Sequence, residues 1–268
     1  MGSKKMRDFD IDAVVAQVIP IVREAGELVR DAFGADKKIT HKGRVDLVTE
    51  TDIAVEKFLV ERLAPLLPEA TFLAEESAKE TQLGTFTWII DPLDGTTNFA
   101  HGLPFVANSI ALWHEDRVVL GVVNLPILGE LFSAVEGRGA YLNDSRISVS
   151  EEASLDKTVI ATGFPYAIEE HLNDVLNNLE KLLPIVQGVR RPGAAAMDLA
   201  YVAAGRYDGF YESALNPWDT AAGLLLVQEA GGRVSERDCE KEYTFSSPNI
   251  LATNGRIHDD LSKILTEC

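Results

Sequence analysis

The segment best suited to chemistry reads WIIDPLDGTTNF and spans Trp88–Phe99. Its apolar start predicts a strand that delivers Asp91 at its end, where Pro92 forces a turn. Asp94 then lies within reach of the same ion as Asp91, and paired carboxylates suit hard cations, which take oxygen ligands. The amides from Gly95 onward are placed to form an anion-binding concavity or the start of a helix. A divalent cation would mediate between these carboxylates and a bound phosphate.

Three further segments contribute the acids Glu75, Asp52 and Asp219, each beside an apolar strand or helix. Each has an ordinary alternative explanation: a solvated pair of acids, an exposed helix residue, or an acid that complements a helix dipole. The Asp-Pro-x-Asp-Gly sequence alone also fits an Asx-type turn with solvated acids. The occurrence of all four segments in one chain weakens these alternatives.

Helices and short strands are expected to position the acids. In the first half, apolar spacing predicts two helices and then five strands, three of them in an antiparallel meander. These elements are the helices Ile11–Phe33 and Glu50–Leu63 and the strands Thr71–Ala74, Trp88–Ile90, Val106–Trp113, Arg117–Leu125 and Glu130–Val135. Pro20 is expected to kink or interrupt the first helix.

The second half alternates between strands and helices. In order, we expect a strand near Thr158–Ala161, a helix at Glu170–Leu183, a strand near Val189, a helix at Ala194–Ala204, a strand at Tyr207–Tyr211, a helix at Pro217–Ala230, a strand at Asn249–Thr253 and a helix from Ile257. Helices layered on two sheets, one largely antiparallel and one mixed, follow from this order. We expect one compact unit over residues 1–268, with halves at about 1–148 and 149–268 that meet near Ser145–Ser154.

These segments resemble the inositol monophosphatase family of magnesium-dependent, lithium-sensitive phosphatases, which are related to the fructose-1,6-bisphosphatases. Trp88–Phe99 matches the first motif of the family without a gap, and Trp218–Gly232 matches its second. The helix Arg191–Ala196 and the strand ending at Phe210–Glu212 fit in the same order. The resemblance covers nearly the whole chain and implies an α+β fold, a layered α-β-α-β-α sandwich.

The resemblance also implies a metal site. Glu75, Asp91 and the carbonyl of Leu93 would hold one Mg²⁺. Asp91, Asp94 and Asp219 would hold a second, and a third, weaker ion would bind near Glu75. Two such ions bridged by one carboxylate activate a water and stabilise a leaving oxygen. Li⁺ is expected to inhibit.

Catalytic and substrate contacts follow from the same resemblance. Thr96 and Asp52, assisted by Glu75, would orient the attacking water, and the amides of Gly95 and Thr96 would bind the phosphate. The hydroxyl groups of the substrate would contact Asp94, Ala195, Glu212 and Asp219.

The substrate is less closely defined than the chemistry. Inositol monophosphate is expected first, with fructose-1,6-bisphosphate, histidinol phosphate, adenosine 3′,5′-bisphosphate and NADP as alternatives. A basic residue is expected shortly before Asp46, where Lys42 is favoured over His41, and Asn216 stands where some relatives carry His. A non-catalytic binding or regulatory protein of this fold is the remote alternative. A haloacid-dehalogenase-type phosphatase is disfavoured, because its second Asp follows at two residues rather than three.

Composition excludes several other classes of protein. The chain has 268 residues, 46% of them hydrophobic, and 25 basic against 42 acidic residues give a net charge of −17. No apolar run approaches the ~18 residues of a membrane helix, and the negative charge disfavours nucleic acid as a partner. Two cysteines fit a reducing cytoplasm rather than a disulfide framework. The five histidines are expected mostly at the surface or in loops, and a homodimer is carried over from the resemblance.

Overall fold

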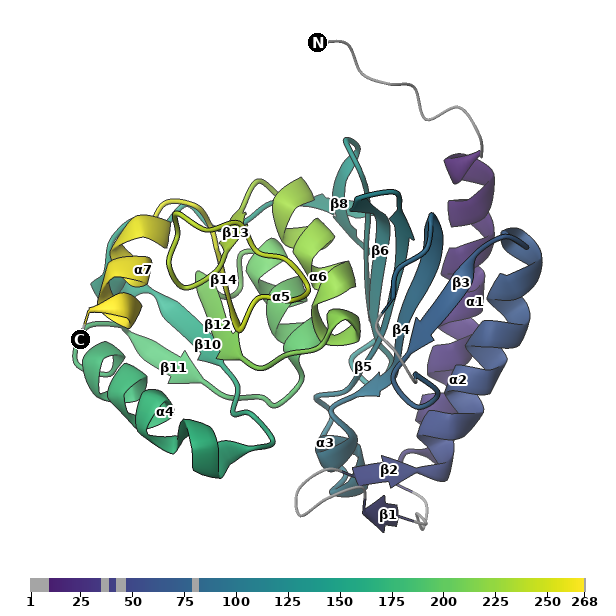
Figure 1. The fold of residues 1–268 in the computed structure, drawn as a ribbon, viewed down its shortest axis with the longest axis horizontal. Coiled ribbons are helices and arrows are strands. Elements are labelled where there is room, and N and C mark those ends of the chain that lie inside the picture. The colour runs from purple at the N-terminus through teal and green to yellow at the C-terminus, as the bar shows by residue number, and fades with distance from the viewer. Residues whose placement is uncertain (1–9, 35–38, 42–46, 79–81, 268) are drawn as a thin grey trace.

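Helices and sheets alternate in five layers, which form an α-β-α-β-α sandwich (Figure 1). The structure is a computed structural model that describes residues 10–34, 39–41, 47–78 and 82–267. Two helices cover the outer face of one sheet, two lie between the sheets, and two cover the other sheet. In that order they are α1 (Ile11–Ala32), α2 (Glu50–Leu63), α5 (Ala195–Ala203), α6 (Pro217–Glu229), α4 (Ile168–Leu182) and α7 (His258–Thr266). The predicted fold class is confirmed.

The larger sheet has seven strands in the order β3-β4-β5-β6-β7-β8-β9. β3 and β4 are parallel, and every later pair is antiparallel, so the predicted meander is confirmed. The strands are β3 (Thr71–Ala74), β4 (Phe86–Asp94), β5 (Ala107–His114), β6 (Arg117–Leu125), β7 (Glu130–Val135), β8 (Gly139–Leu142) and β9 (Ser145–Ile147). The sequence did not predict β8 and β9, which are too short to show a clear alternation.

The smaller sheet is mixed, as predicted, and has the order β11-β10-β12-β14-β13. β10 is parallel to β11 and β12, and β14 is antiparallel to β12 and β13. The strands are β10 (Val159–Thr162), β11 (Gly188–Arg190), β12 (Gly209–Ser213), β13 (Arg233–Ser235) and β14 (Asn249–Thr253). The three-residue strand β13 was not predicted.

Short elements complete the described chain. They are β1 (Ile39–His41), β2 (Leu47–Thr49), α3 (Thr96–Ala100) and the 3₁₀ turns Ala64–Leu66 and Leu155–Lys157. α1 continues through Pro20, so the expected interruption does not occur; Pro20 lies on the exposed side of the helix. Among the described helices, none has the length and hydrophobicity that a bilayer crossing requires.

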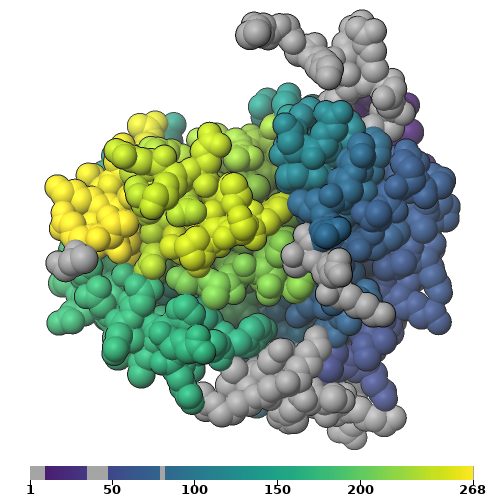
Figure 2. All heavy atoms as spheres, viewed as in Figure 1, coloured from purple at the N-terminus to yellow at the C-terminus, as the bar shows by residue number. Residues whose placement is uncertain are grey.

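Alternating side chains of β4 pack into two different hydrophobic cores. Trp88 and Ile90 pack against α1 and α2, whereas Ile89 packs in the layer that holds α5 and α6. α6 lies so close to the larger sheet that a Cβ on Gly121 would be 2.7 Å from the carbonyl of Ala222. The inner core contains residues of both halves, and the space-filling view shows the green and yellow half against the blue half along one broad boundary (Figure 2).

Candidate active site

An irregularity in β4 brings two acids to one side of the sheet. Asp91 pairs with Ser109 of β5 and Asp94 pairs with Ala107, so the register shifts between the two acids. In a regular strand, residues three apart point to opposite faces, and the extra residue of a bulge reverses this. Asp91 therefore lies inside β4. The sequence had suggested that it lies at the end of this strand. Its Oδ1 accepts the N–H of Leu93 at 2.9 Å, which closes the turn.

Glu75 joins Asp91 from the neighbouring parallel strand. It directly follows β3, and its N–H donates to the carbonyl of Ile90 at 3.1 Å. Burial raises the pKa of Asp91 well above its usual value, and the charges of Glu75, Asp94 and Asp219 raise it further. A hydrogen bond between the side chains of Glu75 and Asp91 also favours the protonated form. Four acids from β3, β4 and α6 therefore influence one another.

Asp94 ties the end of β4 to the start of α5. Its Oδ2 accepts the N–H of Ala196 at 2.8 Å. Burial raises the pKa of Asp94 to about 7, although hydrogen bonds from the amides of Ala196, Ala195 and Met197 oppose the shift. The carboxylate thus lies at the positive end of the helix, where negative charge is favoured.

Asp219 lies in the first turn of α6 and closes its capping box. Its Oδ2 accepts the N–H of Asn216 at 2.6 Å, and the Asn216 side chain accepts a hydrogen bond in return. Burial raises the pKa of Asp219 to about 7, and the charge of Asp94 contributes to the shift. The residue therefore caps a helix, as the alternative interpretation proposed, and also interacts with the other acids.

Thr96 and Asp52 lie together, as the resemblance implied. Thr96 Oγ1 is 3.0 Å from Oδ1 of Asp52 and 3.1 Å from the carbonyl oxygen of Leu93. Asp52 is fully buried in the first turn of α2, where its Oδ2 accepts the N–H of Thr49 at 2.9 Å. Burial raises the pKa of Asp52, although hydrogen bonds from Thr49 and Thr96 oppose this. The interpretation of Asp52 as an exposed helix residue is therefore wrong.

A single side-chain amide joins the two halves of the chain beside these acids. Nδ2 of Asn98 donates to the carbonyls of Phe105 at 2.8 Å and Pro192 at 2.9 Å, and the carbonyl of Gly193 is 3.3 Å away. Just before α3, Gly95 has a φ of 85°, and a Cβ there would lie 2.6 Å from the carbonyl of Phe105. α3 and the turn before it are thereby fixed relative to the segment that precedes α5.

A cavity of about 540 Å³ opens above these residues. Its lining includes, besides Asp94, Asp219 and the turn Gly95–Asn98, the residues His101, Gly163–Tyr166, Ile168, Arg191, Gly193–Ala195, Glu212 and Ala214–Asn216. Glu212 is buried on β12; burial, with the charge of Asp219, raises its pKa to about 8. A Cβ on Gly163 would lie 2.0 Å from Oε2 of Glu212, so a larger residue there would displace the Glu212 carboxylate.

The donor set fits a divalent cation. Asp91, Asp94 and Asp219 offer buried oxygens, and their mutual repulsion, visible in the raised pKa values, is what a cation removes. Among the described residues, no three aspartate, glutamate, histidine or cysteine side chains are arranged so that they could hold a metal ion without moving. Asp94 and Asp219 instead direct an oxygen to backbone N–H groups.

The structure brings together the residues that the sequence nominated, with few exceptions. The nominated residues that lie at this site are Asp52, Glu75, Asp91, Leu93, Asp94, Gly95, Thr96, Ala195, Glu212 and Asp219. Lys42 lies outside the described residues, and His41 ends β1. The sequence did not predict the hydrogen bonds of Asn98 or the place of Arg191 in the cavity lining. The expected helix at Arg191–Ala196 begins only at Ala195, because Gly193 has a φ of 86° and Ala194 is extended.

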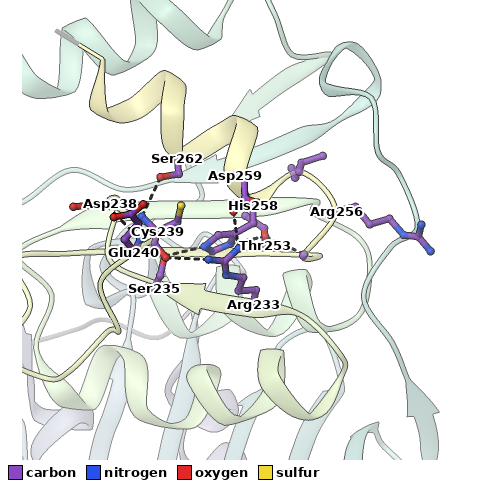
Figure 3. A network of polar contacts seen from close by, with 12 residues as sticks. Arg233, Ser235, Asp238, Cys239, Glu240, Thr253, Arg256, His258, Asp259 and Ser262 are labelled. Carbon is purple, nitrogen blue, oxygen red and sulfur yellow. Dashed lines mark hydrogen bonds and ion pairs between the residues drawn. The ribbon is translucent and has the colours of Figure 1, made fainter.

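A second buried polar cluster lies under α7 (Figure 3). His258 is fully buried, so the expectation of surface or loop histidines is wrong for this residue. Its Nε2 is 2.8 Å from Ser235 Oγ, and its Nδ1 is 2.9 Å from Thr253 Oγ1, which also accepts the N–H of Gly255. Ser235 Oγ donates its hydrogen to the carbonyl of Glu236, so the neutral ring donates to Ser235 through Nε2, and Thr253 donates to Nδ1. Burial, with the charge of Arg233, lowers the pKa of His258 to about 4.

Comparison with known proteins agrees with the geometry. The model of the inositol monophosphatase family matches residues 10–268. An inositol-1-monophosphatase of Synechocystis is 46% identical over 91% of this chain and 85% of its own, and the Nus factor SuhB of Escherichia coli is 42% identical over 88% and 89%. The crystal structure of the extragenic suppressor protein suhB from Bartonella henselae superposes with a TM-score of 0.89 at 41% identity, over 95% of this chain and 99% of its own.

Proposed function

Because the chain belongs to the inositol monophosphatase family, we propose that it hydrolyses inositol monophosphate with Mg²⁺ bound at the acids of β3, β4 and α6. Members of the family are metal-dependent phosphatases that act on phosphomonoesters, so the chain is a phosphoric monoester hydrolase. One observation carries the proposal: four acids from distant segments interact beside the hydrogen-bonded pair of Thr96 and Asp52.

We propose two or three metal ions in this site. Glu75, Asp91 and the carbonyl of Leu93 would hold the first, and Asp91, Asp94 and Asp219 the second, with a third near Glu75. When bound, such ions activate a water and stabilise the leaving oxygen of an in-line displacement. Asp91, the shared ligand of this proposal, is 2% exposed, and the charges of all three other acids raise its pKa.

The side chains around the ions position water and substrate. Thr96 Oγ1 shares its hydrogen between Asp52 and the carbonyl of Leu93, so its lone pairs accept a hydrogen from the attacking water and orient it. Glu75 assists by taking a proton from that water. The amides of Gly95 and Thr96 bind the phosphate, and Asp94, Ala195, Glu212 and Asp219 contact the hydroxyl groups of the alcohol.

A panel of phosphomonoesters assayed with and without Mg²⁺, and with added Li⁺, tests the proposal. We expect phosphate release from inositol monophosphate that requires Mg²⁺ and falls with Li⁺. Faster release from histidinol phosphate, adenosine 3′,5′-bisphosphate, NADP or fructose-1,6-bisphosphate would replace the substrate but keep the chemistry. Absence of Mg²⁺-dependent release from every ester would support a non-catalytic protein of this fold, an outcome of interest because one relative is named a Nus factor.

The remaining expectations concern the assembly and the cell. We propose that residues 1–268 act as one unit that forms a homodimer, in the cytoplasm, without binding nucleic acid. Sedimentation equilibrium of the full chain tests the dimer, and cell fractionation tests the location. A monomer at micromolar concentration, or retention of the protein on nucleic acid at physiological salt, would contradict these proposals.

A further inference from the structure

A second, much smaller cavity shares part of its wall with the large one. About 10 Å³ of it is open to the centre of a water molecule, which is room for a single water. Gly163, Pro165 and Glu212 line both cavities. The other residues that line the small cavity are Thr162 of β10, Tyr211 and Ser213 of β12, and Asp174, Val175 and Asn178 of α4. The small cavity therefore lies between α4 and the smaller sheet.

An ion pair holds the part of α4 that lines the small cavity. Nη1 of Arg237 donates to both carboxylate oxygens of Asp174, at 3.0 and 2.8 Å. The backbone N–H of Arg237 donates to Oδ1 of Asn249 at 2.6 Å, so the ion pair connects α4 to the start of β14. Asp174 and Asn178 are four residues apart, which places them on one face of the helix. The ion pair therefore fixes the face of α4 that carries Asn178.

Two residues that line the small cavity have polar groups without a hydrogen-bond partner. Asn178 is 2% exposed, and its Oδ1 has no partner among the described residues. Glu212 is 9% exposed, and its carboxyl group receives no hydrogen bond from the described part of the chain. A buried acceptor without a donor is unfavourable. Because one water donates two hydrogens, a water in the small cavity would satisfy both acceptors.

Packing alone does not set the orientation of the Glu212 carboxyl group. The group lies against Gly163, since a Cβ on that glycine would be 2.2 Å from Oε1 and 2.0 Å from Oε2. This contact limits where the carboxyl group lies, but rotation about the last side-chain bond of a glutamate has only a weak preference. A hydrogen bond from a fixed donor would decide which carboxyl oxygen faces the large cavity.

We propose that Asn178 is a positioning residue that holds a water in the small cavity, and that this water orients the Glu212 carboxyl group toward the hydroxyl groups of the substrate. The proposal rests on the proposed function, because it assumes that Glu212 contacts those hydroxyl groups. Asn178 does not line the large cavity, so it acts through Glu212 and not by direct contact with the substrate. It affects the affinity for the alcohol and takes no part in the chemical step.

Inositol 1-phosphate and 4-nitrophenyl phosphate, assayed with saturating Mg²⁺, test the proposal. The nitrophenyl ring carries no free hydroxyl group, so Glu212 has nothing to orient against. The readout is the ratio of kcat/KM for inositol 1-phosphate to kcat/KM for 4-nitrophenyl phosphate. We expect Asn178→Leu to lower this ratio by about 10-fold, the effect of one hydrogen bond of ordinary strength. The loss is expected in KM for inositol 1-phosphate and not in kcat.

Asn178→Ala separates positioning from packing. Alanine leaves room for a further water, which can replace the amide oxygen, so the ratio should fall less than in Asn178→Leu. If Asn178 only filled space, the order would be reversed, because leucine fills the site and alanine leaves a cavity. Asn177→Leu is the matched control. Asn177 is the exposed neighbour of Asn178 on α4 and lines neither cavity, so this variant should keep the wild-type ratio.

A double variant tests whether Asn178 acts through Glu212. In a Glu212→Ala background, Asn178→Leu should change the ratio by less than about twofold, because the group that it positions is gone. A crystal structure of the full chain should show one ordered water within hydrogen-bond distance of both Asn178 Oδ1 and the Glu212 carboxyl group.

Three results would overturn the proposal: a small cavity without that water, an unchanged ratio in Asn178→Leu, or an undiminished effect of Asn178→Leu in the Glu212→Ala background. If the wild-type protein hydrolyses neither ester with Mg²⁺, the proposed function fails. If it hydrolyses both and the ratio does not respond to Asn178, only the positioning role fails.

Discussion

The acidic cluster around Asp91 and the cluster around His258 are both buried and polar, yet they differ in how their charges are balanced. His258 is neutral, and each of its ring nitrogens faces a hydroxyl that has a further partner. The charges that act most strongly on Asp91 are those of Glu75, Asp94 and Asp219, and burial together with this like charge favours the protonated form of Asp91.

The contrast distinguishes buried polar groups that stabilise the fold from buried charged groups that indicate a binding site. A closed network of neutral hydrogen bonds stabilises the fold and offers nothing to a ligand. A group of buried like charges destabilises the fold until a cation arrives, so its presence indicates a binding site. Four experiments test whether the two clusters differ in this way.

The largest effect is expected for Asp91→Asn. Turnover should fall by about 10²–10³-fold or more, because the shared ligand of both proposed ions is lost. The metal-free variant should also melt at a higher temperature than the metal-free wild type, since one repelling charge is removed. Steady-state kinetics and thermal unfolding with and without Mg²⁺ measure both effects.

Asp208→Asn is the control for that experiment. Asp208 is also buried, but its Oδ2 accepts the N–H of Val159 at 2.8 Å, away from the cavity lining. This variant should lose stability and keep the stabilisation by Mg²⁺. Near-normal turnover of Asp91→Asn would contradict the metal assignment.

Asn98→Ala tests the hydrogen bonds by which Asn98 links α3 to the segment before α5. Without the donor, the turn before α3 and the start of α5 are free to shift, and a misplacement near 1 Å costs about 10²-fold in rate. We expect a fall in kcat of that order while thermal stabilisation by Mg²⁺ is retained. Retained turnover would show that other contacts fix the two segments, and loss of the Mg²⁺ effect would place Asn98 in metal binding instead.

His258→Ala should act on stability alone. The change leaves a cavity and removes partners from two buried hydroxyls, which costs about 2–3 kcal/mol in the free energy of unfolding. Turnover per folded molecule and its Mg²⁺ dependence should stay at the wild-type value. Denaturant titration measures the free energy of unfolding, and kinetics at denaturant concentrations below the transition measure turnover. An altered Mg²⁺ dependence of turnover would contradict the purely structural role assigned to the His258 cluster.

The pH dependence of stability should have opposite signs for the two clusters. The pKa of Asp94 and Asp219 is raised to about 7 and that of Glu212 to about 8, so the metal-free folded state binds more protons than the unfolded state. Its free energy of unfolding should therefore fall as the pH rises from about 4 to about 8. The pKa of His258 is lowered to about 4, so its contribution is lost as the pH falls from about 6.5 to about 4.

Mg²⁺ separates these two contributions. Between pH 6.5 and 8 the acids of the cavity change more than His258 does, so Mg²⁺ should stabilise the protein more at pH 8 than at pH 6.5. Denaturant titrations at both values, with Mg²⁺ and with a chelator, measure the difference. A metal-free protein that becomes more stable over this range would contradict the charge repulsion assigned to the cavity.

The sequence predicted those features that depend on local pattern. Apolar runs that end at acids located Glu75 and Asp91, and the helix start located Asp219, because side-chain period and capping are properties of neighbouring residues. The layered fold followed from the order of the elements and from the resemblance.

Features that depend on long-range packing were not predictable in the same way. The bulge between Asp91 and Asp94 exists only in register with β5. Asn98 has partners at Phe105 and at Pro192, 94 residues away in the chain, and nothing near it in sequence indicates the second. His258 is polar and near the end of the chain, so its burial at the start of α7, against β13 and β14, has no local signal.

The hydrogen bond from Asn98 to Pro192, which connects the two halves of the chain, has a consequence for synthesis on the ribosome. A nascent chain that has emerged only as far as the larger sheet holds Glu75, Asp91 and Asp94 but neither Asp219 nor the carbonyl of Pro192. Such an intermediate lacks part of the proposed cation site and of the proposed alcohol-binding residues, so we expect it to be inactive. The last acid is supplied when α6 docks. If Mg²⁺ binds these acids as proposed, it would favour the docked state and would act late in folding as well as in turnover.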